Sequence, residues 1–378
     1  MNLLKVIAFV FILCTSQLSR AQAPKPQATV APSSDAVDRI VLEQVKAQSL
    51  VGISVACARD GTIVLERHYG FEDRAQKVPA SGETMYRWAS ISKPVTSVAA
   101  MQLVETGKLS LDADARSIVN EFPEKPWTIT ICQLLCHQGG IVHYTNGEVV
   151  RLPTPKSPAH PYEDVVVALD TFKMSPLVCE PGTKYSYSTH GYMLVAAAVQ
   201  RAGGEPFWQQ VRSRIAEPAG MKSFRPDYQW ESIPHRAVGY RALAGVVVES
   251  TDTDVSWKLG GGGFISNVGD LSRFSIALMD DRLVRPETFV RMRERQPLRD
   301  GSKTGYGLGL DIGSFRGRPT CAHSGSQEKA ATFLLMAPED GLSVAIMCNT
   351  EGASLRDLAR DLLGEMLPAG GVEAPETK

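Results

Sequence analysis

The sequence predicts an α/β fold, with one antiparallel sheet of about five strands, helices flanking it and a helical lobe alongside. Strand-like segments occur near both ends of the folded body, which we place at residues 35–368 of the 378-residue chain. Between them, residues 94–269 have mostly helical patterning. Because strands far apart in sequence can share one sheet, we expect the first and last strands to pair and the lobe to be inserted between them.

The body begins with an amphipathic helix and a hairpin. Hydrophobic residues recur at helical spacing after Ser33 and Ser34, both of which suit a helix cap. The helical positions are Val37, Ile40, Val41 and Val45. The alternating hydrophobic positions of the hairpin, on either side of an Asp60-Gly61 turn, are Val51, Ile53, Val55, Cys57, Ile63 and Leu65.

The C-terminal part supplies the remaining strands of the predicted sheet. Short hydrophobic segments there are separated by turn residues, as in a run of antiparallel strands. The predicted strands are residues 305–312, 320–323, 332–336 and 342–348. A proline-rich stretch at 152–161 interrupts the helical lobe.

Composition excludes several classes of protein. Lys and Arg total 40, Asp and Glu total 41, and the formal net charge is -1. Nucleic acid and anionic membranes bind basic surfaces, so we expect neither as a partner. A hydrophobic content of 43% with 21% charged residues is typical of a globular protein and not of a disordered chain.

The N-terminal residues have the pattern of a signal peptide. One lysine precedes an apolar run at residues 6–13, and a polar stretch follows. This run is too short for a stable membrane span. The predicted divisions are a signal peptide at 1–21, a linker at 22–34 and a flexible tail at 369–378. We therefore expect an exported protein, periplasmic or secreted.

Of the 7 cysteines, all but Cys14 fall in the predicted mature chain. An oxidising compartment permits disulfides without requiring them, and a chain of this size does not need cross-links. We therefore favour buried thiols and assign no pairing. The remaining residues are Cys57, Cys132, Cys136, Cys179, Cys321 and Cys348.

Ser90 and Lys93 form a Ser-x-x-Lys motif that leads into a helical stretch at residues 95–105. At a helix N-terminus, the serine would lie beside free backbone N–H groups that stabilise an oxyanion, with the lysine one turn further on. A desolvated lysine can lose its charge and accept the serine proton. The motif alone is weak, because it recurs at Ser326 and Lys329, and Ser90 would otherwise be a helix cap.

Further segments resemble the serine β-lactamase and penicillin-binding-protein superfamily, and are closer still to the mitochondrial serine β-lactamase-like proteins and their bacterial relatives. In this superfamily Ser-x-x-Lys is followed by a tyrosine motif and by a strand with Lys- or His-x-Gly. Here these motifs are Tyr187-Ser188-Thr189 and His323-Ser324-Gly325. Other similar phrases lie at residues 121–125, 140–144, 181–192 and 261–271, so the resemblance spans nearly the whole body.

The resemblance implies a cofactor-free acyl-enzyme cycle at a site between the sheet and the lobe. Ser90 would be the nucleophile, and Lys93 and Tyr187 would share the general-base and proton-shuttle work without an assignment between them. A nearby ammonium would favour the phenolate form of Tyr187. The backbone amides of Ser90 and Ser326 would form the oxyanion hole. The other residues implied to line the substrate site are His323, Gly325 and Thr189.

His323 and Thr189 stand where many relatives have lysine and asparagine. Neutral histidine holds a substrate carboxylate less well than lysine, and threonine makes fewer hydrogen bonds to an amide than asparagine. We therefore expect a small peptide, amide or ester substrate. A β-lactamase or D-alanyl-D-alanine carboxypeptidase is the alternative enzyme, and the oligomeric state stays open.

Gln327, Glu328 and Lys329 occupy positions where the family usually has small residues. Bulky side chains are therefore expected beside the oxyanion hole, where partial occlusion would slow the release of an acyl group. The alternative of another class is accordingly a non-catalytic sensor or scaffold that binds penicillin or peptides.

Neither a metal nor a nucleotide site is expected. The glycines at 260–263 lack the following lysine of a phosphate-binding loop, and we expect them to let the backbone approach the site. His137 and His143 do not have the spacing of a zinc-binding helix, and no carboxylate follows at ligand spacing. The sequence also has no G-x-S-x-G elbow of an α/β-hydrolase.

Overall fold

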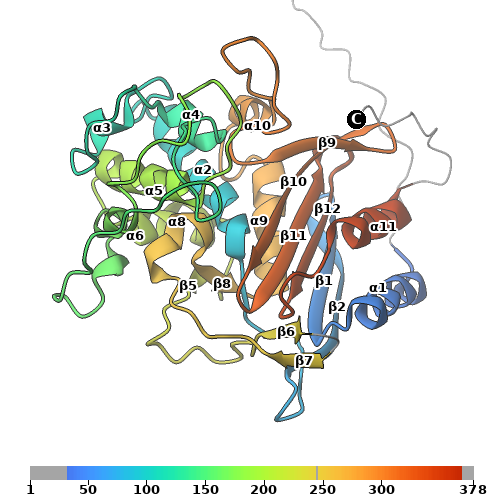
Figure 1. The fold of residues 1–378 in the computed structure, drawn as a ribbon. Coiled ribbons are helices and arrows are strands. Elements are labelled where there is room, and N and C mark those ends of the chain that lie inside the picture. The colour runs from blue at the N-terminus through green and yellow to red at the C-terminus, as the bar shows by residue number, and fades with distance from the viewer. Residues whose placement is uncertain (1–31, 244–245, 368–378) are drawn as a thin grey trace, which may run out of the picture.

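The computed structural model describes residues 32–243 and 246–367 (Figure 1). The predicted signal peptide, most of the predicted linker and the predicted tail lie outside the described residues. Within the described ranges, no helix combines the length and the hydrophobicity needed to cross a membrane.

A seven-stranded antiparallel sheet forms one half of the fold, with the strand order β3-β2-β1-β12-β11-β10-β9. Its N-terminal strands are β1 (Gly52–Arg59), β2 (Thr62–Asp73) and β3 (Val78–Pro79). Its C-terminal strands are β9 (Asp311–Phe315), β10 (Arg318–Gln327), β11 (Ala330–Ala337) and β12 (Leu342–Cys348). The predicted fold class is confirmed, because the first and last long strands pair, with Ile53 opposite Cys348.

The predicted hairpin between β1 and β2 is confirmed, and its turn explains its sequence. Asp60 and Gly61 have φ values of 45° and 77°. Two consecutive positive φ angles are typical of the two-residue turn that matches the twist of a hairpin, and aspartate followed by glycine tolerates them best.

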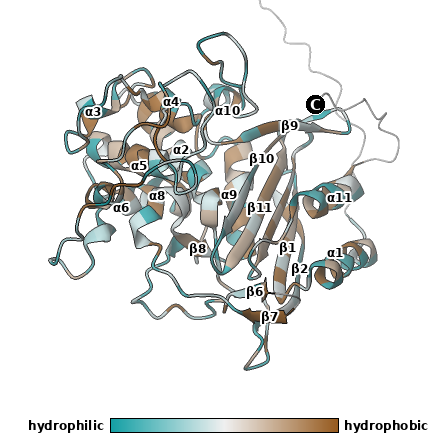
Figure 2. Ribbon diagram, in the orientation of Figure 1, coloured by the Kyte–Doolittle hydropathy of each residue, from teal (hydrophilic) through white to brown (hydrophobic). Residues whose placement is uncertain are grey.

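Helices cover both faces of the sheet (Figure 1). On one face, α1 (Ser34–Gln48) and α11 (Arg356–Met366) pack on each other, and their apolar sides form one core cluster with the strands. On the opposite face, α9 (Val268–Met279) contacts β1 and β12. Figure 2 shows hydrophobic and hydrophilic residues mixed within α1 and α11, as expected for helices with one side in solvent.

The helical lobe lies beside the sheet, with α2 and α5 packed against each other (Figure 1). Its helices are α2 (Ser92–Glu105), α3 (Ala115–Ile118), α4 (Ile131–Leu135), α5 (Thr189–Gly203), α6 (Phe207–Val211), α7 (Glu217–Ala219) and α8 (Leu259–Gly262), and α10 (Pro286–Met292) follows α9. Shorter helical turns are η1 (Ala89–Ile91), η2 (Pro161–Glu163), η3 (Val167–Thr171), η4 (Arg212–Ala216), η5 (Ser256–Lys258) and η6 (Pro338–Asp340). Every residue of α5 from Thr189 to Val199 is buried, so this helix forms part of the core.

The lobe is less helical than predicted. Residues 94–269 also contain the strands β5 (Arg225–Pro226), β6 (Tyr240–Leu243), β7 (Val246–Glu249) and β8 (Phe264–Ser266). The β6–β7 hairpin lies beside the large sheet, where Tyr240 forms a bridge with Thr350 (Figure 1). β8 pairs with β5 and also with β4 (Tyr86–Arg87), which precedes the candidate nucleophile. These strands are two to four residues long, which is too short for an alternating pattern to be recognised in the sequence.

The predicted strand at 305–312 is wrong over most of its length, since β9 begins only at Asp311. Gly309 has a φ of 93°, which breaks an extended strand. A Cβ on Gly307 would lie 2.2 Å from the carbonyl oxygen of Met292, so this loop packs tightly against the end of α10. Gly307 and Gly309 therefore allow a loop to pack closely and do not belong to a strand.

The cysteines of the described residues are free thiols, and most of them are buried. Burial raises the pKa of the Cys321 thiol to about 12, which keeps it protonated and unreactive. The buried residues are Cys57, Cys136, Cys321 and Cys348.

Candidate active site

The candidate nucleophile Ser90 lies in η1, at the junction of the sheet and the lobe. Trp88, which directly precedes η1, is fully buried, and its indole N–H donates to Ser266 Oγ in β8 over 2.7 Å. The Trp88 carbonyl accepts a hydrogen bond of 2.9 Å from Thr332 Oγ1 in β11. Ser266 belongs to the lobe and Thr332 to the sheet, so both halves of the fold fix the segment that carries Ser90.

The backbone before Ser90 is strained and closely packed. Ala89 has a φ of 49°, a left-handed conformation that costs an L-residue about 1–2 kcal/mol. A Cβ on Gly325 of β10 would lie 2.2 Å from Thr332 Oγ1 and 2.5 Å from the Trp88 carbonyl oxygen. Position 325 therefore requires glycine, because β10 passes directly against the Ser90 segment.

Lys93 lies on the first turn of α2 with its amine surrounded by oxygen atoms. Its Nζ is 2.9 Å from Ser90 Oγ, 3.2 Å from Thr189 Oγ1 and 2.7 Å from the Gly261 carbonyl oxygen. A protonated amine would donate to all three oxygens. A neutral amine donates to two of them and turns its lone pair to the Ser90 hydroxyl, which is the geometry for removing the serine proton.

Burial is the main electrostatic influence on Lys93. The side chain is inaccessible to solvent, and the loss of hydration lowers the pKa of Lys93 well below its usual value. The positive charge of Lys258 lowers this pKa further. Both effects increase the fraction of neutral amine near pH 7.

Tyr187 lies beside the same amine, with its ring centroid 4.8 Å from Lys93 Nζ. Burial raises the pKa of Tyr187 well above its usual value, and a hydrogen bond with Ser90 opposes that rise only in part. Burial thus opposes the phenolate character suggested by the sequence, because a charged phenolate is poorly solvated in this position. The Tyr187 hydroxyl keeps its proton and is a proton donor beside Ser90.

The chain after Tyr187 is fixed by the start of α5. Ser188 is the N-cap residue, and its hydroxyl accepts a hydrogen bond from the Gly191 N–H over 2.9 Å. The N–H groups of Ser188 and Thr189 donate to the Nδ1 atoms of His137 and His143, each over 3.2 Å. Thr189 is buried and faces Lys93, so its role in the structure is to hold the amine.

His323 of β10 is buried and neutral. Its Nδ1 donates to the Ser324 carbonyl oxygen over 2.7 Å, and its Nε2 accepts from the Tyr306 hydroxyl over 2.9 Å. Burial and the nearby Lys93 lower the pKa of His323 to about 3. Its ring centroid is 6.4 Å from that of Tyr187, so His323 lies near Tyr187 with both nitrogens already engaged.

Ser326 lies on the part of β10 that borders the Ser90 segment. β9 pairs with β10 only from Arg318 to Ala322, so the outer edge of β10 beyond Ala322 has no strand partner among the described residues. Ser324 and Ser326 are both exposed along this edge. This edge leaves backbone groups without a strand partner next to the Ser90 segment, and the oxyanion role of the Ser326 amide stays a prediction.

The side chains of Gln327, Glu328 and Lys329 point in different directions. The Lys329 ammonium turns away to Asp252, 3.2 Å distant. Glu328 is exposed, and its charge acts on the pKa values of Lys258 and Tyr144. Gln327 alone points its side-chain oxygen toward Gly262, 3.3 Å from the position of an added Cβ. The expected crowding beside the oxyanion hole is therefore limited to Gln327.

The sequence did not identify two contributors to this site, the Gly261 carbonyl and Lys258. The run of glycines was the available signal, and the expectation that it lets the backbone approach the site is confirmed. A Cβ on Gly261 would lie 2.7 Å from Thr189 Cγ2, so only glycine lets this carbonyl reach Lys93. No sequence pattern marks Lys258.

The histidines near the site do not form a metal centre. No group of three or more His, Cys, Asp or Glu side chains suited to a metal ion occurs in the part of the chain that the structure describes. His137 and His143 use their Nδ1 atoms as acceptors for backbone N–H groups, as described above. Burial lowers the pKa of His143 to about 4, so the ring is neutral at pH 7.

Comparisons with known proteins agree with the motif assignment. A family model described as Beta-lactamase matches residues 37–365. The chain is 28% identical to the mitochondrial serine beta-lactamase-like protein of Mus musculus, over 91% of this chain and 84% of that protein. It is also 27% identical to esterase EstB of Burkholderia gladioli, over 84% of this chain and 91% of that protein.

Solved structures share the fold. An octameric penicillin-binding protein homologue from Pyrococcus abyssi has a TM-score of 0.73 and 24% identity, covering 89% of this chain and 79% of that chain. A D-amino acid amidase from Ochrobactrum anthropi SV3 has a TM-score of 0.72 and 22% identity, covering 88% of this chain and 98% of that chain.

The close approach of β10 predicts the effect of Gly325→Ala. The added methyl group has to displace the Trp88 carbonyl or the Thr332 hydroxyl, so Ser90 should move. A shift of about 1 Å can lower reactivity roughly 100-fold, and we expect a loss of that size in the rate at which a fluorophosphonate labels Ser90.

The matched control is Gly313→Ala in β9, where the added Cβ meets only Thr320 Oγ1 at an ordinary 3.5 Å. This variant should be labelled at the wild-type rate. Equal labelling rates for wild type and a folded Gly325→Ala variant would contradict the packing described for β10.

Proposed function

The chain belongs to the beta-lactamase family of serine hydrolases, and from this premise we propose that it forms an acyl-enzyme on Ser90 and hydrolyses a peptide, amide or ester bond. The observation that carries the proposal is the 2.9 Å separation of Lys93 Nζ from Ser90 Oγ. A serine hydroxyl becomes a good nucleophile only when a base takes its proton. The esterase and the amidase among the similar proteins support the same class of reaction.

In the acylation step, the neutral amine of Lys93 accepts the proton of the Ser90 hydroxyl. The serine oxygen attacks the substrate carbonyl carbon, and the carbonyl electron pair moves onto its oxygen. The backbone amides of Ser90 and Ser326 stabilise this oxyanion, since amides fixed in the fold need no reorganisation as the charge develops.

Collapse of the tetrahedral intermediate breaks the bond to the leaving group. Tyr187 donates its hydroxyl proton to the departing nitrogen or oxygen, and the Lys93 ammonium returns the proton taken from Ser90 to the tyrosine. The raised pKa of Tyr187 and the lowered pKa of Lys93 support this division of roles. We therefore assign the base to Lys93 and the proton donor to Tyr187.

Deacylation repeats the same steps with water. Lys93 is neutral again and removes a proton from the water molecule, whose oxygen attacks the ester carbonyl. The bond to Ser90 Oγ breaks, the serine oxygen regains a proton, and the carboxylic acid leaves. No cofactor enters the cycle.

The chemistry around β10 favours ordinary peptide, amide or ester substrates over β-lactam antibiotics. His323 is neutral, and both of its ring nitrogens are engaged by Ser324 and Tyr306. This strand position therefore supplies no cation for a substrate carboxylate, unlike the lysine of many relatives.

We also propose export to the periplasm or the exterior. This proposal rests on the signal-peptide pattern at residues 1–21 of the sequence. Sequencing the N-terminus of the mature protein tests it, with a start near Gln22 as the expected result.

One mass-spectrometric experiment tests the proposed function. The mature protein is incubated with a fluorophosphonate and, separately, with ampicillin, and the mass of the adduct is followed over time for wild type and Ser90→Ala. We expect a fluorophosphonate adduct that requires Ser90 and an ampicillin adduct that clears. A stable ampicillin adduct would favour a sensor, and a folded wild-type protein without any adduct would contradict the catalytic assignment.

The proton-donor role of Tyr187 predicts a selective defect in Tyr187→Phe. General acid catalysis contributes about 10²- to 10⁴-fold, so kcat/KM for alkyl esters or amides should fall by that factor. The loss for p-nitrophenyl esters should be much smaller, because p-nitrophenolate leaves without a proton. The neighbouring Tyr185→Phe should leave both activities unchanged, and an equal loss on both substrate types in Tyr187→Phe would refute the role.

A further inference from the structure

Lys258 is a buried cation without a bonding partner. It ends η5, directly before α8, and only 7% of its surface is exposed. Within residues 32–243 and 246–367 its ammonium makes no hydrogen bond or ion pair, and Trp257 offers only its ring face, 5.7 Å from Nζ. Burying an ammonium without a fixed acceptor is costly, and only the small exposed part of this side chain gives it contact with solvent.

Other buried cations of the described chain are satisfied by fixed partners. Lys93 has its three oxygen acceptors, and Arg87 donates to Asp227 over 2.6 Å. Lys125, which is only partly buried, also donates to two backbone carbonyls over 2.8 and 2.7 Å. Unlike these cations, Lys258 has N–H groups that no acceptor in the described residues uses.

Lys258 lies close to the Ser90 segment. Its Cδ is 3.7 Å from the position of a Cβ on Gly262, and the backbone carbon of Ala89 is equally 3.7 Å from that point. The preceding residue, Gly261, supplies the carbonyl that accepts from Lys93 Nζ. Lys93 and Lys258 therefore both lie beside the backbone of Gly261 and Gly262.

Charges of both signs act on Lys258. Burial lowers the pKa of Lys258 to about 8, so the ammonium remains mostly protonated at pH 7. The guanidinium of Arg151 lies over the ring of Trp257, 5.5 Å from its centroid. Among the charged neighbours, Glu328 and Asp254 oppose the lowering of this pKa and Arg87 adds to it, but neither carboxylate forms an ion pair with the Lys258 ammonium.

The neighbouring histidines add no charge. Burial lowers the pKa of both His143 and His190 to about 4, and the positive charge of Lys258 contributes to each shift. Both rings are therefore neutral at pH 7. An anionic group that entered here would meet Lys258 without competition from a fixed carboxylate partner.

We propose that Lys258 forms an anion subsite beside Ser90 and that the substrate is an ester or amide carrying a carboxylate. This inference rests on the proposed function, because it names the substrate class of the same site. A carboxylate would supply the acceptors that the ammonium lacks, through charge-assisted hydrogen bonds. The subsite lies on the lobe, on the Gly261-Gly262 side of Ser90, whereas neutral His323 lies on the sheet.

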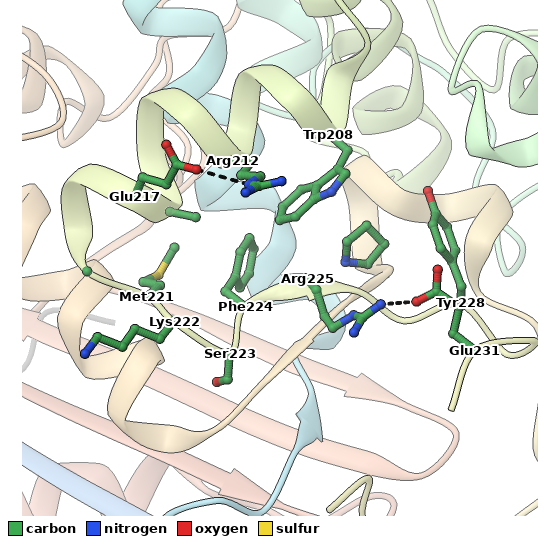
Figure 3. A pocket seen from close by; sticks show the side chains of 13 residues that line it. Trp208, Arg212, Glu217, Met221, Lys222, Ser223, Phe224, Arg225, Tyr228 and Glu231 are labelled. Carbon is green, nitrogen blue, oxygen red and sulfur yellow. Dashed lines mark hydrogen bonds and ion pairs between the residues drawn. The ribbon is translucent and has the colours of Figure 1, made fainter. Parts of the chain in front are cut away.

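The cavity beside α6 does not offer a comparable anion site. It has a volume of about 600 Å³ and lies beside α6, η4 and β5, with Trp208 on its wall (Figure 3). Its two arginines already have partners, Arg212 with Glu217 and Arg225 with Glu231. The arginine charges there are paired within the protein, and Lys222 is exposed to solvent, whereas Lys258 is buried and unpaired.

Two matched pairs of esters test the subsite in each half of the substrate. Mono-4-nitrophenyl glutarate and 4-nitrophenyl pentanoate differ in a carboxylate on the acyl group. 4-Acetoxybenzoate and its methyl ester differ in a carboxylate on the leaving group. The measured quantity is the ratio of kcat/KM for the anionic ester to that for its neutral match, in wild type and in Lys258→Met.

We expect the wild-type ratio to exceed that of Lys258→Met by about 10- to 100-fold for at least one pair, the range of a charge-assisted hydrogen bond. Lys258→Arg should retain most of the preference, and the control Lys125→Met should retain all of it. If Lys258 acted only by lowering the pKa of Lys93, both members of a pair would slow equally. Unchanged ratios for both pairs in a folded Lys258→Met would overturn the proposal.

Failure of the subsite is distinguishable from failure of the proposed function. Labelling of Ser90 by a neutral fluorophosphonate does not involve a carboxylate, so labelling together with unchanged ratios refutes the subsite alone. If neither labelling nor turnover occurs, calorimetric titration with glutarate still decides the matter. Binding that is lost in Lys258→Met supports the subsite, and equal or absent binding in both proteins overturns it.

Discussion

The amine of Lys93 is held away from water among three fixed oxygen atoms, and the chemistry of the site depends on this arrangement. An exposed lysine is an ammonium at pH 7 and has no lone pair with which to accept the Ser90 proton. Burial disfavours the charged form, while the Thr189 hydroxyl and the Gly261 carbonyl fix the direction of the amine. The same desolvation keeps Tyr187 protonated, which separates the base from the proton donor.

The fold provides this arrangement by joining its two halves at one short segment. Trp88 is bonded on one side to Ser266 of the lobe and on the other to Thr332 of the sheet. The pairing of β1 with β12 connects the two ends of the chain, so β11 and β10 are fixed relative to the segment that leaves β4. The strain at Ala89 is therefore maintained by contacts from both halves of the molecule.

The sequence predicted the features that depend on local patterns. Alternation identified the β1–β2 hairpin, and a short hydrophobic segment between turn residues identified β12. The i, i+3 spacing predicted that Ser90 and Lys93 lie one helical turn apart. The sequence-based prediction failed at residues 305–312, where glycines that pack a loop resembled a strand. The resemblance to a known family was needed for Tyr187, which is far from Ser90 in the sequence.

Other features depend on tertiary contacts that no local pattern records. The neutrality of His323 follows from burial and from the hydroxyl of Tyr306, which a motif cannot supply. Lys258 is notable because no acceptor in the described residues bonds its ammonium. Such an absence can be recognised only from the contacts of the folded chain. The assignment of the base to Lys93 likewise required the desolvation of two neighbouring groups.

The central claim is that burial lowers the pKa of the Lys93 amine far enough for the amine to act as the base. The most direct measurement is an NMR titration of protein labelled with ¹³C at the lysine Cε, with the Lys93 resonance assigned by its absence in Lys93→Met. The account predicts that this resonance titrates well below the value of about 10.4 typical of an exposed lysine. A Lys93 resonance that titrates at or above that value would contradict the account.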